Sequence, residues 1–438
     1  MTAGLKHIRF RADVCGWTKI GIVVALGDKN VRLADDVDTE AQRVSRTTVR
    51  SVPVLVHRFA LWILVFGFLL RIAVSFWNGF YGPSFGASED ADNFHLFAVD
   101  AANGTLDERD YSTGWIYGSL LGIVYRTFGA SLFLAGLLSA VAWLIAAIAL
   151  AKLCRLLGFN QRATVFVLII YALLPSSILV TGVPLREVYQ MLFVNLVLLA
   201  GIHLLRRVRL RYLLLFLASA YAAAWLHAAL AAFGVLAAVI FFAAKMSRRG
   251  LKIGVLLATG GLFVIAFLGA STVIGLDAAF SLSDSVTIFR GRAPDDARTN
   301  YPSTLEFGSD WALAVELPLI LFRYLFEPMP WRIMSVLDVY LFVENICRLA
   351  LIVSATRFIM RVSRFRVELL ALTACYFASE GIWAIGTVNW GTASRHHLPM
   401  LGCLLLIGFA RSGQNGSGQR KPRVAQNVAP KDQVVSTN

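Results

Sequence analysis

The sequence predicts an all-α polytopic membrane protein with about ten transmembrane helices and further interfacial helices on its outer face. Of its 438 residues, 57% are hydrophobic and 16% are charged, whereas soluble domains have roughly 25% charged residues. The mean hydropathy is +0.66. The net charge of +14 lies mostly in short basic runs between apolar segments and near both ends, where the positive-inside rule places it in the cytoplasm. No nucleic-acid partner is therefore indicated.

The first crossings are expected wherever about 20 apolar residues follow one another. Pro175 interrupts one of these segments. Basic runs flank residues 212–245 on both sides, so this long segment must cross an even number of times, and we expect a hairpin with its turn near 225–227. The predicted segments are 59–80, 131–151, 163–181, 187–205 and the two helices within 212–245.

The remaining crossings are residues 252–275, 333–356, 367–386 and 398–410. Two other apolar stretches are expected to be interfacial. Residues 114–128 contain Arg126, and residues 311–326 leave no room for a further crossing before the basic run at 357–366. Both termini then lie in the cytoplasm, and the loops 81–130, 276–332 and 387–397 all lie on the outer side.

The chain divides into three predicted parts. Residues 1–52 form a basic cytoplasmic extension without a secretory signal, residues 53–411 form the transmembrane domain, and residues 412–438 form a disordered cytoplasmic tail rich in Gly, Ser, Gln and basic residues. The five cysteines are scattered without a CxxC motif. Neither a disulfide framework nor a zinc site is indicated.

An acidic segment follows the first apolar run, at residues 87–98. It places Glu89, Asp90 and Asp92 beside Phe94 and His95. Charge close to lipid is costly, so we expect this segment to supply a catalytic acid on the outer face. A polar loop with solvated acids is the alternative, since loops are commonly polar.

Several arginines are expected on the same outer side. Arg186 precedes a helix start, where the helix dipole favours the adjacent Glu187 but disfavours a cation, which indicates an anion or an acid as its partner. Arg290 and Arg292 suit phosphate, because the planar guanidinium matches phosphate oxygens. A solvated loop with internal ion pairs is the alternative for their region, which also contains Asp295, Asp296, Arg298 and Tyr301.

Arg395, His396 and His397 directly precede the last apolar segment. Positive charge at the outer face opposes the positive-inside rule, and a lipid phosphate would offset it. Two adjacent histidines without spaced partners are a weak indication of a metal site.

Glu344 and Glu380 fall within predicted spans, where an acid indicates either a function or a bond across helices. His227, at the predicted hairpin turn, is expected to be an interfacial aromatic residue. No Gly-rich phosphate loop, Ser-His-Asp order or HExxH motif occurs, so cytoplasmic nucleotide chemistry is not indicated.

The segment from Asp90 to Ala98 (DADNFHLFA), followed by Asn103 and Gly104, resembles the first outer loop of the GT-C superfamily. These are polytopic glycosyltransferases that use polyprenyl-phosphate sugars. Residues 111–125 look like the family's interfacial helix, and residues 174–187 look like its turn between the third and fourth spans. Segments 323–331 and 389–399 resemble parts of bacterial GT-C-like and related polysaccharide-assembly membrane proteins.

The likeness covers roughly residues 55–410 and has two departures. The large soluble C-terminal domain of some members has no counterpart in this sequence. The aspartate pair common in the family's first loop is replaced by Glu89 and Asp90, with Asp92 following. By position Asp90 matches best.

The resemblance implies an inverting glycosyltransferase that moves a sugar from a polyprenyl-(di)phosphate carrier to a glycan or lipid acceptor. Its place would be the periplasmic face of a bacterial inner membrane, in the synthesis of a cell-surface polysaccharide or exopolysaccharide. The implied partners are the polyprenyl-phosphate-linked sugar or oligosaccharide, membrane lipid and other polysaccharide-assembly proteins. The sequence requires no cofactor, although some GT-C enzymes use a divalent metal.

The implied roles fall on the outer residues. An acceptor hydroxyl needs a general base, and arginines would stabilise the leaving phosphate. The base would be Asp90, with Glu89 and Asp92 as alternatives. Arg395 is the first choice for the carrier phosphate, followed by Arg186, Arg290 and Arg292, and the residues expected to bind the remaining substrate are His95, Glu187, Tyr301, His396 and His397.

Three other functions stay open. A polysaccharide repeat-unit polymerase would use the same chemistry. A lipid-linked saccharide transporter or flippase would show intramembrane charge, broken helices and inverted repeats; Glu344 and Glu380 are present, but no clear repeat is. A non-catalytic assembly scaffold would leave the outer acids dispensable.

Overall fold

The computed structural model describes residues 52–82, 88–105, 115–247, 299–301, 310–361 and 366–410. Apart from the first turn of one helix, all of them belong to the unit Val56–Asn438, one of two into which the chain divides. Several predictions lie outside the described residues: the N-terminal extension up to residue 51, the span at 252–275, Arg290, Arg292 and the tail from residue 411. The side chain of Glu89 lies outside them too.

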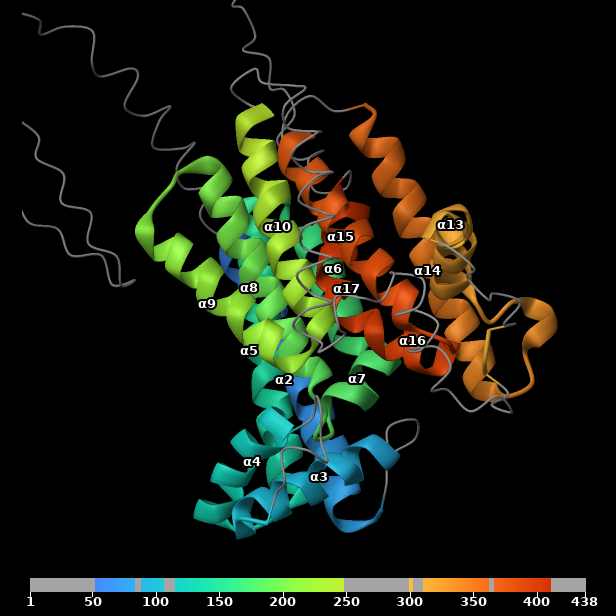
Figure 1. The fold of residues 1–438 in the computed structure, drawn as a ribbon. Coiled ribbons are helices and arrows are strands. Elements are labelled where there is room, and N and C mark those ends of the chain that lie inside the picture. The colour runs from blue at the N-terminus through green and yellow to red at the C-terminus, as the bar shows by residue number, and fades with distance from the viewer. Residues whose placement is uncertain are drawn as a thin grey trace, which may run out of the picture. The chain divides into compact units, whose positions relative to one another are not determined.

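The described part of the chain is helical and contains no β-strand; one isolated bridge pairs Asn300 with Asn389. The α-helices are α2 (Val52–Phe80), α3 (Ser88–Asn103), α4 (Trp115–Phe128), α5 (Leu132–Leu156), α6 (Gln161–Leu173), α7 (Pro175–Thr181), α8 (Glu187–Arg206), α9 (Leu210–Leu226), α10 (Ala228–Ser247), α13 (Asp310–Phe326), α14 (Val336–Ile359), α15 (Arg366–Gly386), α16 (Trp390–His396) and α17 (Leu398–Gly408), with a 3₁₀ turn at Pro330–Arg332. Figure 1 shows their arrangement.

Several helices are long and apolar enough to cross a membrane, as predicted. Within the described ranges there are 5, or up to 6 if the bent pair α6–α7 is one span, and α9 and α17 are shorter apolar helices. An α-helical membrane protein is therefore confirmed at this level. The 5 long helices span Arg58–Phe80, Leu132–Leu156, Glu187–Arg206, Ala228–Ser247 and Val367–Gly386.

Helix boundaries agree with the predicted breaks at two places. The segment 212–245 forms two helices, α9 and α10, separated at His227. The segment 163–181 breaks at Leu174, directly before Pro175, and its halves meet at an angle of 55°. Proline ends α6 here because it has no N–H to donate and its ring excludes helical backbone before it.

The predicted loop at 387–397 is instead mostly the short helix α16, which is a correction to the sequence interpretation. Asn389 caps this helix by accepting a hydrogen bond from the Thr392 N–H at 2.7 Å. This cap stabilises the start of a helix that is only seven residues long.

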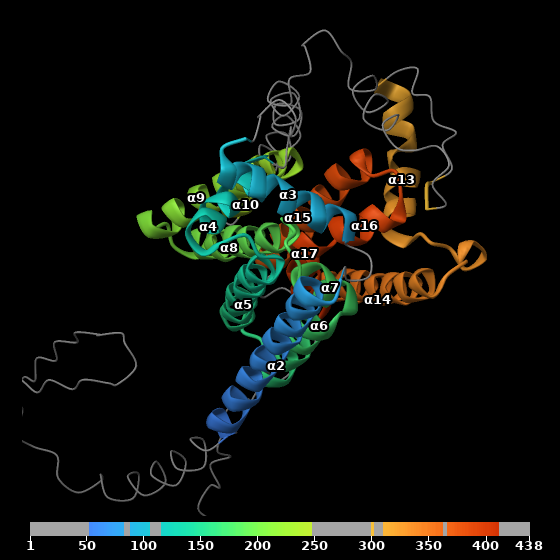
Figure 2. The ribbon, with the colours of Figure 1, turned by 90° about the horizontal axis from the view of Figure 1, so that it is seen from below.

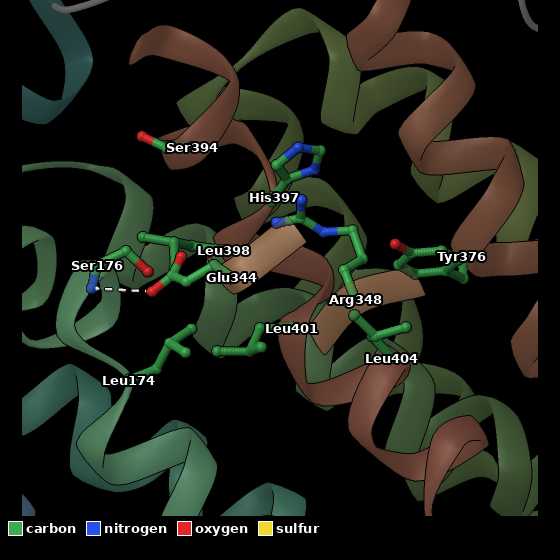
Figure 3. A pocket seen from close by; sticks show the side chains of 10 residues that line it. All are labelled: Leu174, Ser176, Glu344, Arg348, Tyr376, Ser394, His397, Leu398, Leu401 and Leu404. Carbon is green, nitrogen blue, oxygen red and sulfur yellow. Dashed lines mark hydrogen bonds between the residues drawn. The ribbon is translucent and has the colours of Figure 1, made fainter. Parts of the chain in front are cut away.

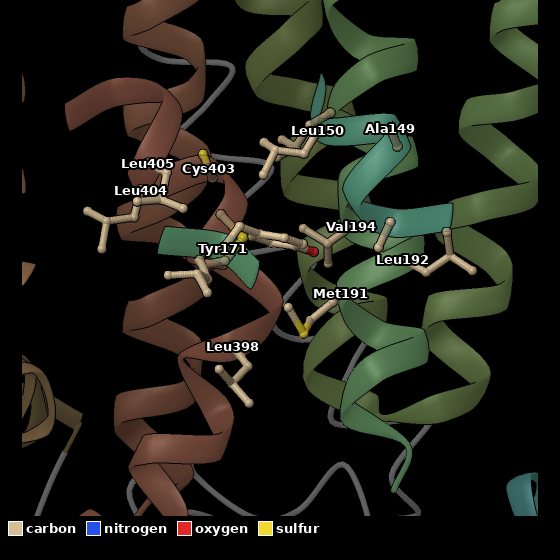
Figure 4. Packing of buried hydrophobic residues seen from close by; sticks show 14 of the residues in the cluster. Ala149, Leu150, Tyr171, Met191, Leu192, Val194, Leu398, Cys403, Leu404 and Leu405 are labelled. Carbon is tan, nitrogen blue, oxygen red and sulfur yellow. The ribbon is translucent and has the colours of Figure 1, made fainter. Parts of the chain in front are cut away.

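The helix α8 lies at the centre of the bundle and contacts α5, α9, α10 and α17. In the most apolar 18-residue stretch of α8, 72% is buried, whereas the corresponding value for the peripheral α2 is 28%. Figure 4 shows the packing around Met191 and Val194. Glycine allows α17 to approach α8 closely, because a Cβ on Gly402 would lie 2.5 Å from the Asn195 Oδ1 atom.

Arg71 of α2 occupies the break between α6 and α7. Its side chain is fully buried and donates hydrogen bonds to the Ala172 carbonyl at 3.0 Å and the Thr181 Oγ1 atom at 2.6 Å. It also lies over the Trp143 ring at 3.7 Å. The break frees carbonyl groups that water cannot reach inside a bundle, and Arg71 supplies donors to them. Sequence analysis did not identify this role.

The ends of the helices that carry basic runs lie together, away from the end that carries α3, α7 and α16 (Figure 1). Arg206 at the end of α8 pairs with Glu368 at the start of α15 at 3.6 Å. The Lys245 Nζ atom, near the end of α10, donates to the Leu204 carbonyl of α8. Viewed from below, α3 lies close to α16 (Figure 2).

The helix α13 crosses α14 rather than running alongside it, as Figures 1 and 2 agree. It contains Pro318 and packs mainly against α15. It is not among the helices that pass the length and hydropathy criteria for a span. The expectation of an interfacial or re-entrant helix at 311–326 stays a prediction.

Candidate functional site

The helix α3 places Asp90 at the end of the bundle. Ala91, Phe94 and Ala98 form its buried face, and the Phe94 ring meets the Tyr117 ring of α4 edge-on at 5.1 Å. Asp90 lies in the first turn, where an acid is favoured by the helix dipole. Phe94 follows it at position i+4, so both project from the same side of the helix.

Asp90 forms an ion pair with Arg395 of α16, a residue 305 positions later in the chain. The Arg395 Nη1 atom donates to the Asp90 Oδ2 atom. The Asp90 side chain is 46% exposed, whereas that of Arg395 is 19% exposed. The pair therefore joins an accessible carboxylate to a guanidinium that is held more firmly by its surroundings.

Arg186 and Glu187 lie beside this ion pair, at the start of α8. The Arg186 Nη1 atom donates to the Leu226 carbonyl at 3.3 Å, and its guanidinium lies over the Phe94 ring at 5.7 Å. Glu187 is only 6% exposed, and its Oε2 atom has no hydrogen-bond partner among the described residues. A buried carboxylate oxygen without a partner is unusual in native proteins and indicates a missing ligand or water.

The two arginines influence each other through the carboxylates between them. Burial lowers the pKa of Arg186, while Glu187 and Asp90 act in the opposite direction. Burial also lowers the pKa of Arg395, but Glu187 and Asp90 outweigh it, so the pKa is raised overall. Both guanidinium groups are charged at neutral pH. The site thus presents two cations and two carboxylates at one end of the bundle.

His396 and His227 form an aromatic cluster with Trp383. The Trp383 ring lies 4.0 Å from the His396 ring and 4.4 Å from the His227 ring. Burial first, and then the charge of Arg186, lower the pKa of His227 to about 3. Burial and His227 likewise lower that of His396. Both imidazoles are neutral at pH 7, so neither contributes a positive charge for a phosphate.

His397 turns away from Asp90 into the bundle. Its Nδ1 atom lies 2.6 Å from the Glu380 Oε2 atom and its Nε2 atom lies 3.1 Å from the Tyr324 carbonyl. It lines a small cavity with a volume of about 20 Å³. This leaves room for about one water molecule. Glu344 and Arg348 also line it (Figure 3).

The two acids predicted to lie within spans, Glu344 and Glu380, both have partners in other segments. The Glu344 Oε1 atom accepts a hydrogen bond from the Ser176 N–H, at the start of α7, at 3.5 Å. Arg348, four residues later, donates to the Leu325 carbonyl at 2.9 Å. Both acids therefore bond across helices. Arg348 was not identified from the sequence, although its spacing from Glu344 is that of an ion pair on one helical face.

Three other predicted residues lie away from the ion pair. The His95 Nδ1 atom lies 2.8 Å from the Tyr125 hydroxyl of α4, and Asp92 is exposed. Burial lowers the pKa of His95, and Asp92 partly offsets this. Tyr301 packs near Trp390, with ring centroids 6.5 Å apart. The structure therefore brings Asp90, but not Asp92, to Arg395.

A second charged group on the far side of α16 was not predicted. Glu327 pairs with Arg332, whose guanidinium lies over the Trp390 ring at 4.5 Å. The Trp390 Nε1 atom donates to Asp338 at 3.2 Å. Trp390 and Arg395 both belong to α16, so these contacts help to hold the helix that carries Arg395. The short spacing from Glu327 to Arg332 was the available signal.

No group of three or more His, Cys, Asp or Glu side chains suited to a metal ion occurs among the residues that the structure describes. Comparisons with protein-family models, curated proteins and solved structures found no match for this chain. Support for a function therefore comes from the site and from the sequence resemblance.

Proposed function

We propose that this protein is a GT-C-like membrane glycosyltransferase that moves a sugar from a polyprenyl-(di)phosphate carrier to a glycan or lipid acceptor. One observation carries the proposal. Asp90, from the acidic segment that resembles the GT-C first loop, lies against Arg395, from the segment before the last helix. A carboxylate and a guanidinium at the same place are the two groups that this transfer needs.

In the proposed reaction Asp90 is the general base. It takes the proton of an acceptor hydroxyl as that oxygen attacks the anomeric carbon, because a hydroxyl is a poor nucleophile while it keeps its proton. The bond between the anomeric carbon and the phosphate oxygen breaks, and its electron pair leaves with the phosphate. Attack opposite to the leaving group inverts the anomeric centre.

Arg395 and Arg186 stabilise the charge on the leaving phosphate. A phosphate that is already anionic needs fixed cations rather than a general acid. Guanidinium groups suit this task because they stay charged and bind two phosphate oxygens at once. Glu187 lies beside them, and its Oε2 atom has no hydrogen-bond partner among the described residues. It can therefore accept a hydrogen bond from a hydroxyl group of the substrate.

The proposal includes a topology of about ten spans with both termini in the cytoplasm. The end of the bundle that carries α3 and α16 then faces the periplasm of a bacterial inner membrane. The carrier phosphate would approach along the membrane surface, at the depth where α3 and α16 lie. Support for this orientation comes from the basic runs at the opposite end of the bundle.

Two other functions would also use residues of this site. A polysaccharide repeat-unit polymerase would perform the same substitution with a longer donor, so it shares Asp90 and Arg395. A transporter for lipid-linked saccharides would need the arginine but no base. The broken pair α6–α7 and the intramembrane Glu344 and Arg348 are features that transporters also have.

The proposal is tested in a strain that lacks the gene, complemented with Asp90→Asn or Arg395→Ala. We expect Asp90→Asn to lower transfer roughly 100- to 10,000-fold, as for loss of a general base. Arg395→Ala should lower it roughly 100- to 1,000-fold, as for loss of a group that stabilises the developing charge. The matched controls are Asp100→Asn on α3 and Arg126→Ala on α4, each losing the same charge away from the site.

The measurement is mass spectrometry of accumulated lipid-linked saccharides. Loss of one sugar branch supports a transferase, whereas single lipid-linked repeats without polymer support a polymerase. Wild-type product from both site variants would refute the proposed function. Loss of transport with Arg395→Ala but not with Asp90→Asn would favour a transporter.

A further inference from the structure

The ion pair between Asp90 and Arg395 occupies one atom of each group that the assigned roles would use. The Arg395 Nη1 atom donates to the Asp90 Oδ2 atom, so the ion pair occupies the position from which an acceptor hydroxyl would approach that oxygen. A guanidinium that already binds a carboxylate cannot offer the same N–H groups to a phosphate. In the structure, Asp90 and Arg395 therefore bind each other.

We propose that the carrier phosphate replaces the Asp90 carboxylate at Arg395, so that binding of the anionic carrier releases the base. The inference rests on the proposed function and adds an order of events to it. The phosphate binds first, Asp90 leaves Arg395, and only then does Asp90 accept the proton of the acceptor. The ligand class is a phosphate monoester or diester anion.

The exposure of the two partners decides which one moves. Arg395 is 19% exposed and Asp90 is 46% exposed. Arg395 belongs to α16, which Asn389 caps and whose Trp390 is fixed by Asp338. Asp90 lies in the first turn of α3, and its side chain is the more exposed of the two. The exchange is therefore a movement of the Asp90 side chain, with Arg395 as the fixed receptor.

Glu187 remains beside Arg395 when Asp90 leaves. It acts on Arg395 electrostatically in the same direction as Asp90, yet it is buried and does not form the ion pair itself. When Asp90 leaves, Arg395 keeps one carboxylate neighbour and gains the phosphate. The phosphate favours this position because the Arg186 guanidinium lies within electrostatic reach of it and adds a second positive charge.

The test measures affinity for farnesyl phosphate, a short polyprenyl phosphate, with the full chain in nanodiscs. Asp90→Asn removes the competing carboxylate, so we expect its Kd to fall roughly three- to tenfold, the range for a partly exposed charged contact. Asp90→Ala should do the same. Asp100→Asn removes the same charge from the same helix and should leave the Kd unchanged.

The gain must depend on Arg395. Arg395→Ala should weaken binding, and adding Asp90→Asn to it should give no tightening. Equal tightening by Asp100→Asn would mean a general charge effect and would overturn the inference. So would unchanged or weaker binding by both Asp90 variants, or no binding of farnesyl phosphate by any form.

The outcome is distinguishable from a failure of the proposed function. If Asp90→Asn abolishes transfer but leaves the Kd unchanged, the base assignment stands and the exchange is wrong. If Asp90→Asn binds more tightly and transfers sugar at the wild-type rate, the exchange stands and Asp90 is not the base. Elution as a single species in size-exclusion chromatography shows that each variant is folded.

Discussion

His227 connects pH to stability at the turn between α9 and α10. Its Nδ1 atom accepts a hydrogen bond from the Ala229 N–H at 3.1 Å, and a protonated imidazole cannot accept this bond. The pKa of His227 is lowered to about 3 by burial and by Arg186, whereas that of an unfolded histidine is near ~6.5. The unfolded chain therefore binds more protons between these two values.

Stability is expected to fall as the pH falls below about 6.5, and the loss should continue towards pH 3. His227 contributes at most about 1 kcal/mol per pH unit, because its side chain keeps some contact with solvent. His227→Asn keeps an acceptor for the Ala229 N–H but cannot be protonated. Its melting temperature in detergent should therefore fall less between pH 7 and pH 5 than that of the wild type. An identical fall in both proteins would contradict this linkage.

Two acids of the segment 87–98 show why residue type alone does not define a site. Asp90 and Asp92 are two residues apart, so they point to different sides of α3. Asp90 meets Arg395, while Asp92 is exposed. The sequence could rank Asp90 first only by resemblance. The helical direction and the position of α16 separate the two acids physically.

The break between α6 and α7 depends on a side chain from another helix. Arg71 donates to the Ala172 and Gly67 carbonyls and to the Ser177 and Thr181 hydroxyls. Replacing it by methionine would leave these acceptors without donors inside the bundle. We expect Arg71→Met to lower stability by about 3 kcal/mol or more.

The measurement is the melting temperature in detergent, with Arg58→Met as the control. Arg58 lies on the same helix but is exposed, so its loss should change the melting temperature little. Arg71→Lys keeps a charge and some donors and should fall between the two. Equal melting temperatures for Arg71→Met and Arg58→Met would show that α7 does not need this support.

The elements of the bundle were largely predictable, because apolar length and proline act locally. The hairpin of α9 and α10 and the break before Pro175 followed from charge flanks and from a missing N–H. The helix α16 was missed because seven residues give no periodic pattern. Arg71 was missed because its partners lie about 100 residues away, beyond any local signal.

At the scale of the whole molecule, the arrangement of basic ends predicts a membrane orientation. Asp100 lies at the end of the bundle with the site, and Arg357 lies in the last turn of α14 at the other end. In a chain whose Cys15 and exposed Cys347 are both replaced by alanine, Asp100→Cys should react in intact cells with a membrane-impermeant maleimide. Arg357→Cys should react only after the membrane is opened. The reverse pattern would invert the topology and remove the periplasmic site.

The candidate site was predictable as a set of residues but not as a geometry. Parity of the crossings predicts that Asp90, Arg186, Glu187 and Arg395 lie on one side of the membrane, and the structure brings these four together at one end of the bundle. His95 and His397 were in the same set, yet they bond to Tyr125 and Glu380. The charges in the sequence predict sidedness, whereas the direction in which each side chain points depends on tertiary packing.

The ion pair of Asp90 with Arg395 also has a consequence for biosynthesis. Its two halves leave the ribosome 305 residues apart, so for most of translation the membrane holds α3 without α16. The helix α17, buried along its whole length from Leu398 to Gly408, follows Arg395 directly and has to enter a bundle that is already partly assembled. A nascent chain therefore carries Asp90 without its arginine partner, and the ion pair can form only after α16 and the following α17 have been made.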